Sequence, residues 1–324
     1  MGEAGHTAGA EAGVARLGTG LGACMDDGKP SATAMMMAMM RAAHLVIDDD
    51  PKIFRDALAL HFCGLEREAA LMNRLRELEA STVARGSSLE FARGLTAQVR
   101  ANAVVRQRYT EDELTKALRR GVAQYVILGA GLDSFAYRRR DLTTALRVFE
   151  IDHPNTQDWK RARLRALRID LPANLTFVPV DFERSTLADT LRALGHRPHL
   201  PSFISWLGVT MYLTEAAVFE TLRYMAHLAP GTELVFQYSL PESHLNEGGR
   251  RVLAAVKGTA ASWSEPWVSQ FDPTKLVDHL KELGFIDVLD IGPEQANAQY
   301  LEGRQDELRI PSHSHLVKAT VGRC

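Results

Sequence analysis

The spacing of hydrophobic residues changes near residue 123 and predicts two structural parts. Over residues 31–122, apolar residues recur three to four positions apart, as on one face of a helix. From residue 123 onward, short apolar runs alternate with amphipathic stretches, which is typical of strands separated by helices. We therefore expect a helical cap over 31–122 and an α/β domain over 123–324. Residues 1–30 are rich in Gly and Ala and lack the basic start and apolar centre of a signal peptide, so we expect a flexible tail there.

The cap is predicted to contain five helices. Ser31 or Thr33 can cap the first helix, Pro51 can open the second, and Gly64 can end the second. Thr110 begins a sequence typical of a helix cap, which predicts that a last helix starts there and ends at residue 121. The expected helices cover residues 31–41, 51–62, 66–84, 88–104 and 110–121.

The α/β domain is predicted to contain a doubly wound, mostly parallel, seven-stranded sheet. Strands separated by helices are joined by right-handed crossovers, which makes neighbouring strands parallel. The last two strand-like runs have no helical pattern between them, so we expect an antiparallel C-terminal hairpin with a long connection. Residues 240–270 interrupt the alternation and are expected to form an insertion over the functional site. The expected strands are 124–128, 146–151, 175–180, 202–207, 232–239, 285–291 and 315–321, and the expected helices are 155–168, 186–194, 214–228 and 273–283.

Composition limits the classes of partner. The chain is 46% hydrophobic, which gives ample material for a core, and 38 Lys and Arg against 40 Asp and Glu leave a net charge of −2. Electrostatics therefore give no reason to expect nucleic acid or an anionic membrane as a partner, and no apolar stretch reaches the length of a membrane span. Cys24, Cys63 and Cys324 lie far apart without metal-ligand spacing, which favours a reducing cytoplasm and argues against a bound metal. The sequence carries no signature of oligomeric state.

A strand that ends in a Gly-x-Gly turn is the first candidate for a binding site. The apolar residues 124–128 lead directly into Gly129 and Gly131. Glycine lets the backbone approach a ligand at positions where a Cβ atom would collide with it. The alternative is a tight strand-to-helix turn that binds nothing.

Asp152 strengthens the interpretation as a ligand site. It follows the next predicted strand, 21 positions after Gly131, where a nucleotide-binding βαβ unit carries the acid that accepts hydrogen bonds from a ribose. The alternative is a cap for the following helix. Glu150 lies on the same face of the strand and either shares this role or supports a neighbouring arginine.

The turn lacks the third glycine of a dinucleotide-binding fingerprint, because Ser134 occupies that position. That glycine accompanies a pyrophosphate at a helix N-terminus. We infer a ligand that has an adenosine but no pyrophosphate, of which S-adenosylmethionine is the commonest. An NAD(P)-dependent oxidoreductase is the alternative.

Two further strand ends carry candidate residues. Asp181 and Phe182 follow the third strand, where an acid can bind the amino group of adenine and an apolar side chain can flank the ring; a helix cap is the alternative. Trp206 and Tyr212 lie at the end of the fourth strand, where aromatic rings can attract a sulfonium and shape an acceptor pocket. Both rings can equally be part of the core.

Together these motifs resemble those of the leucine carboxyl methyltransferase family of S-adenosylmethionine-dependent methyltransferases. The resemblance is strongest to its bacterial branch of uncharacterised and secondary-metabolite O-methyltransferases, and it implies a class I, Rossmann-like methyltransferase domain. It extends from about Ser31 to Val321. The motifs are QYVILGAGLD at 124–133 with Tyr137 and Arg138, FEIDHP at 149–154 with Lys160, VDF at 180–182, and GVTMYL at 208–213.

The resemblance implies roles for single residues. Gly129 and Gly131 contact the methionine part of the cofactor, Asp152 contacts the ribose, and Asp181 with Phe182 contacts the adenine. Basic residues of the cap lie near the cofactor carboxylate. The full set of cofactor-binding candidates is Arg41, Arg106, Gly129, Ala130, Gly131, Asp133, Asp152, Asp181 and Phe182.

One position departs from the family pattern. Eukaryotic members carry Glu five residues before the tyrosine that matches Tyr212, whereas this chain has Leu207. The departure leaves cofactor binding intact but argues against the C-terminus of a protein phosphatase as the substrate.

The reaction expected from the resemblance is methyl transfer to a carboxylate or hydroxyl of a small molecule. A carboxylate is already ionised at neutral pH and needs no base, whereas a hydroxyl would need one. Tyr212 is the first candidate for contact with the acceptor. His153 lies beside Asp152, but a histidine at a strand end is more often structural. A non-catalytic protein that binds S-adenosylmethionine is the remaining alternative.

Overall fold

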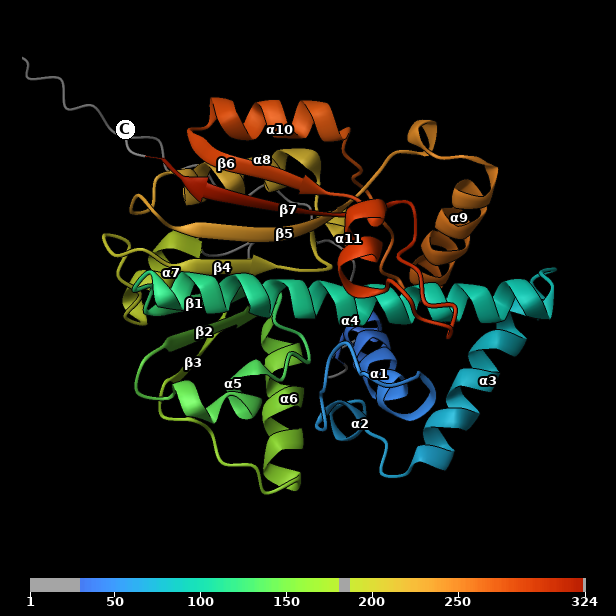
Figure 1. Cartoon of the computed structure of the whole chain (residues 1–324). Coiled ribbons are helices and arrows are strands. Elements are labelled where there is room, and N and C mark those ends of the chain that lie inside the picture. Colours follow the sequence, from blue (N-terminus) through green and yellow to red (C-terminus); the bar gives the residue numbers. More distant parts are fainter. Residues whose placement is uncertain (1–29, 181–186, 323–324) are drawn as a thin grey trace, which may run out of the picture.

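The computed structural model describes residues 30–180 and 187–322, and within them a seven-stranded sheet forms the centre of the molecule (Figure 1). The strand order is β3-β2-β1-β4-β5-β7-β6. Strands β1 to β5 pair in parallel, and β7 pairs antiparallel with both β5 and β6. The predicted doubly wound, mostly parallel sheet with an antiparallel end is therefore confirmed. The strands are β1 (Gln124–Leu128), β2 (Arg147–Asp152), β3 (Leu175–Pro179), β4 (Phe203–Trp206), β5 (Glu233–Ser239), β6 (Phe285–Ile291) and β7 (Ser314–Val321).

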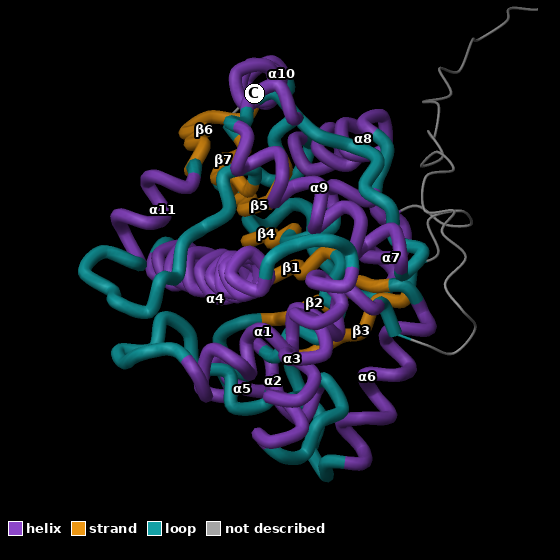
Figure 2. Tube along the Cα trace, turned by 90° about the vertical axis from the view of Figure 1, so that its right-hand side faces the viewer, coloured by secondary structure: helices purple, strands orange, loops and turns teal. Residues whose placement is uncertain are grey.

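Helices cover both faces of the sheet (Figure 2). On β1, Val126 and Leu128 pack with helices α7, α8 and α10, whereas Tyr125 and Ile127 pack with α4, α5 and α11. This alternation follows from the pleat, which directs successive side chains to opposite faces. The helices of these two layers are α4 (Leu89–Arg119), α5 (Phe135–Arg138), α7 (Leu187–Ala193), α8 (Glu215–Ala226), α10 (Pro273–Glu282) and α11 (Pro293–Tyr300), and α6 (Pro154–Ala166) lies beside β3.

Helix α4 is continuous over 31 residues, where the sequence predicted two helices. Thr110, the expected cap of a new helix, donates its hydroxyl hydrogen bond to the carbonyl oxygen of Arg106 one turn earlier (2.8 Å). No glycine or proline follows Gly94 within the helix, so nothing interrupts it. Its second half packs against the sheet and joins the predicted cap to the α/β domain. Among the helices of residues 30–180 and 187–322, none is both long enough and apolar enough to cross a bilayer.

The second predicted helix is mostly absent, because α2 spans only Ala59–Phe62. In the segment before it, the amide of Ile53 donates to His44 Nε2 (3.0 Å), and Arg108 Nη1 donates to the carbonyl of Ile53 (3.3 Å). These side chains satisfy backbone groups that a helix would have paired internally. The remaining helices before α4 are α1 (Ala32–Ile47) and α3 (Glu68–Ala84).

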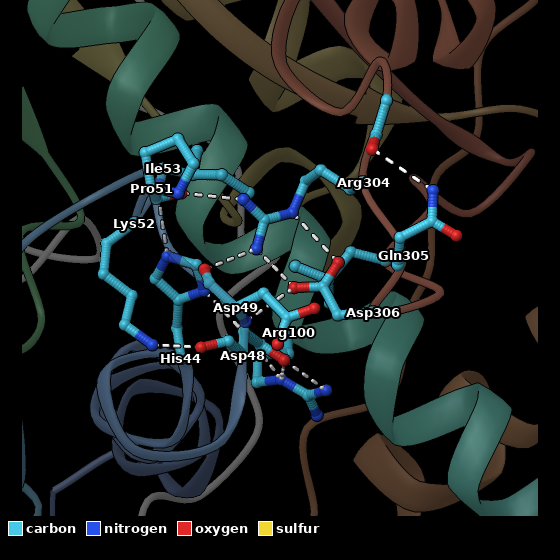
Figure 3. A network of polar contacts seen from close by, with 12 residues as sticks. His44, Asp48, Asp49, Pro51, Lys52, Ile53, Arg100, Arg304, Gln305 and Asp306 are labelled. Atoms are coloured by element: carbon cyan, nitrogen blue, oxygen red, sulfur yellow. Dashed lines mark hydrogen bonds and ion pairs between the residues drawn. The ribbon is translucent and has the colours of Figure 1, made fainter.

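A polar network joins the end of α1 to α4 and to the segment after α11 (Figure 3). Asp48 is buried and accepts hydrogen bonds from Arg100 Nε (2.8 and 2.9 Å) and from His44 Nδ1 (2.8 Å). Arg304 donates to the carbonyl oxygen of Asp49 (2.8 Å). The network fixes α1 at the position from which its first turns reach the candidate site.

Two helices occupy segments for which no helix was predicted. Helix α11 lies between β6 and β7, where no helix was predicted, and Gln295 accepts a hydrogen bond from the Gly292 amide at its start (3.1 Å). Ala296 is the one residue of α11 that is buried, so the helix leaves little hydrophobic pattern in the sequence. The insertion at 240–270 contains α9 (Glu247–Ser262), which lines the cavity described below.

Candidate active site

The Gly-x-Gly turn and the acid after β2 lie in direct contact. Strands β1 and β2 pair in register up to Leu128 opposite Ile151, which brings the two strand ends together. The Gly131 amide donates to Asp152 Oδ2 (2.5 Å), and the Ala130 amide donates to the carbonyl of Ile151 (2.9 Å). The two residues that the spacing argument selected thus lie together at the carboxyl edge of the sheet.

The Asp152 carboxylate is only partly exposed and is oriented by the backbone. Burial raises the pKa of Asp152, while the amides of Gly131 and His153 act in the opposite direction. His153 caps α6, because its Nδ1 accepts from the Asn155 amide (3.2 Å). This structural role explains the histidine without any part in catalysis. Each Asp152 oxygen keeps acceptor capacity for a hydroxyl pair such as a ribose diol.

Glu150 supports a lysine, and not the arginine that was one of the expected alternatives. Its Oε2 accepts from Lys160 Nζ (2.6 Å), and both side chains are almost fully buried. Burial raises the pKa of Glu150 to about 7, although Lys160 acts against the rise. The pair ties α6 to β2 directly below Asp152.

Gly129 is required by both conformation and space. Its φ is +63°, and a Cβ at this position would lie 2.2 Å from Val209 Cγ2. Gly129→Ala is therefore expected to cost about 1–2 kcal/mol for the left-handed backbone and about 1–3 kcal/mol more for the collision. Urea denaturation measures the total.

Gly121→Ala is the matched control for that substitution. Gly121 has a φ of +90°, but no atom lies within 4 Å of an added Cβ. The control should lose only the part of the free energy of unfolding that comes from the left-handed backbone, about 1–2 kcal/mol. Equal losses in Gly129→Ala and Gly121→Ala would contradict the close packing of Val209 on the turn.

Asp133 is engaged on both carboxylate oxygens by protein groups. Gln107 Nε2 donates to Oδ2 (2.8 Å), and the Phe135 amide donates to Oδ1 (2.7 Å). The residue is buried and fastens the glycine turn to α4. A direct contact of Asp133 or Ala130 with a cofactor stays a prediction.

Arg41 is likewise held by protein partners. It lies on α1 and pairs with Asp56 (Nε to Oδ2, 2.9 Å), while its Nη2 donates to the carbonyl of Leu132 (2.6 Å). Asp56 also accepts from the Ser134 hydroxyl (2.7 Å). Arg41 therefore supports the glycine turn through Asp56 and the carbonyl of Leu132. Its contact with a cofactor carboxylate stays a prediction.

Arg106 differs because part of its guanidinium lacks a protein partner. Its Nη1 donates to Gln237 Oε1 (2.7 Å), but its buried Nε has no hydrogen-bond partner among the described residues. Burial, followed by the nearby charge of Arg41, lowers the pKa of Arg106 to about 10, so the group stays protonated at neutral pH. A Cβ on Gly208 would lie 2.7 Å from Arg106 Nη1, so that glycine leaves room for the guanidinium.

Tyr212 lies between the start of α1 and the insertion. Its hydroxyl donates to Thr33 Oγ1 (3.1 Å), and Thr33 in turn bonds to Glu265. Its ring meets that of Trp267 edge-on at a centroid distance of 6.4 Å. Burial raises the pKa of Tyr212, so the hydroxyl remains protonated at neutral pH and does not act as a base.

A cavity of about 970 Å³, counting its open mouth, borders Arg106, Gly208 and Tyr212. Its other walls come from α1, α3, α4 and α9 and from the ends of β5 and β7. Figure 1 shows α1, α3 and α9 grouped on one side of the central sheet. The apolar lining residues are Met36, Met37, Leu78, Leu95, Val99, Met211, Val252, Val256, Ala260, Trp263 and Trp267.

Some predicted and some unpredicted residues meet in this region. Asp181 and Phe182 fall outside the described residues, so their predicted roles stay predictions. Gln237 and His313 line the cavity without having been singled out from the sequence, whereas Trp267 belongs to the 240–270 insertion that was expected over the site. Leu207 is partly buried and packs against the apolar core beneath α4.

Two solved structures resemble the whole described chain in fold. A solved methyltransferase structure from Thermobifida fusca, whose assignment is provisional, matches with a TM-score of 0.54 at 15% identity and covers 92% of this chain and 97% of that chain. A DUF574-family structure from Streptomyces avermitilis gives a TM-score of 0.52 at 14% identity over 91% of this chain and 98% of its own. These likenesses establish the fold, which is that of the class I methyltransferases.

The sequence comparisons identify the family. The sequence profile named leucine carboxyl methyltransferase matches residues 34–226. YktD of Bacillus subtilis, provisionally named an S-adenosyl-L-methionine-dependent methyltransferase, is 34% identical over 226 residues, which are 68% of this chain and 73% of the relative. FRAAL3718 of Frankia alni, with the same provisional name, is 32% identical over 77% of this chain and 81% of its own length. The chain therefore belongs to the leucine carboxyl methyltransferase family and is a methyltransferase.

Proposed function

We propose that this methyltransferase transfers the methyl group of S-adenosylmethionine to a carboxylate or hydroxyl of a small molecule. The observation that carries the proposal is the Asp152 carboxylate, bound to the amide of Gly131 at the carboxyl edge of the sheet. This is the position at which open α/β sheets bind nucleotides. The spacing of the cysteines supports a cytoplasmic location, and the resemblance to bacterial O-methyltransferases supports a role in secondary metabolism.

The cofactor is S-adenosylmethionine, and the residues present fit it. Asp152 would accept hydrogen bonds from the ribose hydroxyls, and the turn at Gly129 and Gly131 would bring backbone against the methionine part. The unpartnered Nε of Arg106 is a charged donor that suits the cofactor carboxylate. Asp181 and Phe182 are proposed for the adenine by the family resemblance alone.

The protein's own contribution is alignment and the exclusion of water. The bound cofactor supplies an electrophilic methyl group on a positively charged sulfur. Holding an acceptor oxygen about 3–3.5 Å from that methyl, in line with the bond that breaks, can supply roughly 7–11 kcal/mol of the rate enhancement. Tyr212, with its hydroxyl bound to Thr33, joins α1 to the wall of the cavity.

Family membership argues against the oxidoreductase alternative. Ser134 is used structurally, because its hydroxyl donates to Asp56. A non-catalytic cofactor-binding protein is distinguished by turnover, since such a protein would bind S-adenosylhomocysteine but form no methylated product from any acceptor.

Asp152→Ala is expected to weaken binding of S-adenosylhomocysteine at least tenfold, because two ribose hydroxyls lose their hydrogen-bond acceptor. Isothermal titration calorimetry measures the affinity. The matched control is Asp158→Ala on an exposed position of α6, which should leave the affinity unchanged. Retained affinity in Asp152→Ala would remove this residue from the cofactor site.

A further inference from the structure

Three buried polar atoms without hydrogen-bond partners belong to residues that line the same cavity. They are Arg106 Nε, Trp267 Nε1 and His313 Nδ1, and the statement covers the residues that the structure describes. A buried polar group that lacks a partner costs about 1–3 kcal/mol, so such groups mark positions where a ligand can supply the partner. Arg106 is assigned above to the cofactor, which leaves Trp267 and His313 for the acceptor.

His313 is positioned by the end of the sheet. It directly precedes β7, and its carbonyl accepts from the Leu240 amide after β5 (2.8 Å). Its side chain is 3% exposed. Burial, together with the neighbouring His315, lowers the pKa of His313 to about 4, so the imidazole is neutral at pH 7. A neutral imidazole has one nitrogen that can accept a proton.

Trp267 packs against both His313 and Tyr212. Its ring centroid is 5.8 Å from that of His313 and 6.4 Å from that of Tyr212. The indole nitrogen can only donate a hydrogen bond. The residues that line the cavity thus include one donor and one base on adjacent rings, which is the complement of a hydroxyl group.

We propose that the methyl acceptor is an apolar, ring-bearing compound with a hydroxyl group, and that His313 accepts the hydroxyl proton during methyl transfer. The proposal rests on the proposed function and makes its substrate class more specific.

The charge of the cavity favours a hydroxyl over a carboxylate. Among the described lining residues, Arg106 is the one side chain that carries a full charge at neutral pH. A carboxylate buried among apolar groups needs a cationic partner, and the lining residues that the structure describes include no second lysine or arginine. A neutral hydroxyl needs no cationic partner.

The walls favour an apolar, ring-bearing body for the acceptor. Methionine and tryptophan side chains adapt to flat apolar surfaces and contact rings favourably. Helix α9 supplies Val252, Val256 and Ala260, and Trp263 follows directly. These residues lie beyond the 34–226 span that matches the family profile.

The proposed step is balanced. A lone pair of the acceptor oxygen forms the new bond to the methyl carbon, and the sulfur–methyl bond breaks with its electron pair remaining on sulfur. The oxygen–hydrogen bond breaks and its proton moves to the unprotonated ring nitrogen of His313. The imidazolium then returns the proton to solvent, and the sulfur leaves as a neutral thioether.

A pair of naphthalene probes tests the proposal on the full chain saturated with S-adenosylhomocysteine. By calorimetry, 2-naphthol should bind at least tenfold more tightly than 2-naphthoate. When S-adenosylmethionine replaces S-adenosylhomocysteine, mass spectrometry should detect 2-methoxynaphthalene formed from 2-naphthol. Tighter or equal binding of 2-naphthoate, methylation of it in place of the naphthol, or no product from the naphthol would overturn the proposal.

His313→Leu tests the residue itself. The variant should lose at least tenfold in affinity for 2-naphthol and at least 100-fold in its methylation rate, while its affinity for S-adenosylhomocysteine changes less than twofold. His196→Leu is the control, because His196 is also buried with a pKa lowered to about 4, mainly by burial, but packs on Phe149 away from the cavity. Unchanged naphthol methylation in His313→Leu would overturn the role of the histidine.

The outcomes separate the two proposals. If S-adenosylhomocysteine itself fails to bind the wild-type chain, the proposed function fails. If it binds but 2-naphthoate is the preferred acceptor, the proposed function stands and the hydroxyl inference fails. The wild-type comparison decides even if His313→Leu does not fold.

Discussion

Arg106→Met should weaken the binding of S-adenosylhomocysteine by on the order of 100-fold, because a charge-assisted hydrogen bond to a buried carboxylate contributes about 1.5–3 kcal/mol. The guanidinium is buried and held by Gln237, and within the part of the chain that the structure describes its Nε has no partner, so it is available to pair with an anion. Methionine keeps the length of the side chain and removes the charge. Calorimetry with S-adenosylhomocysteine measures the loss.

Two further variants make this prediction specific. Arg108→Met changes an arginine on the same helix that pairs with Asp112 at the surface, and it should leave the affinity unchanged. Gly208→Ala adds a methyl group whose carbon would lie 2.7 Å from Arg106 Nη1, so it should displace the guanidinium and give an intermediate loss. Wild-type affinity in Arg106→Met would show that the cofactor carboxylate binds elsewhere.

Lys160→Met should destabilise the fold by about 3–5 kcal/mol, because it leaves the buried Glu150 carboxylate without its cation. The pKa of Glu150 is already raised to about 7 by burial with Lys160 present. An acid whose pKa is higher in the folded than in the unfolded chain binds its proton more tightly when folded, so stability falls as pH rises. Urea denaturation of the variant should therefore show a larger loss at pH 8 than at pH 6.

The controls for this prediction are a second pair and a double variant. Lys281→Met removes an exposed lysine 4.0 Å from Asp278 and should change the free energy of unfolding by less than about 1 kcal/mol. Glu150→Leu combined with Lys160→Met removes both charges and should recover much of the loss. A small, pH-independent effect of Lys160→Met alone would contradict the buried pair.

The parts of the fold that followed from the sequence are those with strong local patterns. The strands of the sheet were predicted within one or two residues, because buried strands are short apolar runs bounded by polar residues. The segment at 51–58 was wrongly predicted as helical because a distant side chain, His44, binds its backbone. Helix α11 was missed because one buried residue leaves no periodicity.

The candidate site divides in the same way. The contact of Gly131 with Asp152 could be predicted because a βαβ unit fixes the distance between two consecutive strand ends. The contact of Arg106 with Gln237 and the approach of Trp267 to His313 join segments far apart in the sequence. No local pattern specifies such contacts, since they depend on how α4 and the insertion pack on the sheet.

A crystal structure of the full chain with S-adenosylhomocysteine tests the central claim most directly. The account predicts ribose hydroxyls within hydrogen-bond distance of the Asp152 carboxylate, the cofactor carboxylate on Arg106, and the sulfur facing the cavity bordered by Tyr212. Adenosine bound at another surface, with Asp152 and Arg106 free of contact to it, would contradict the account.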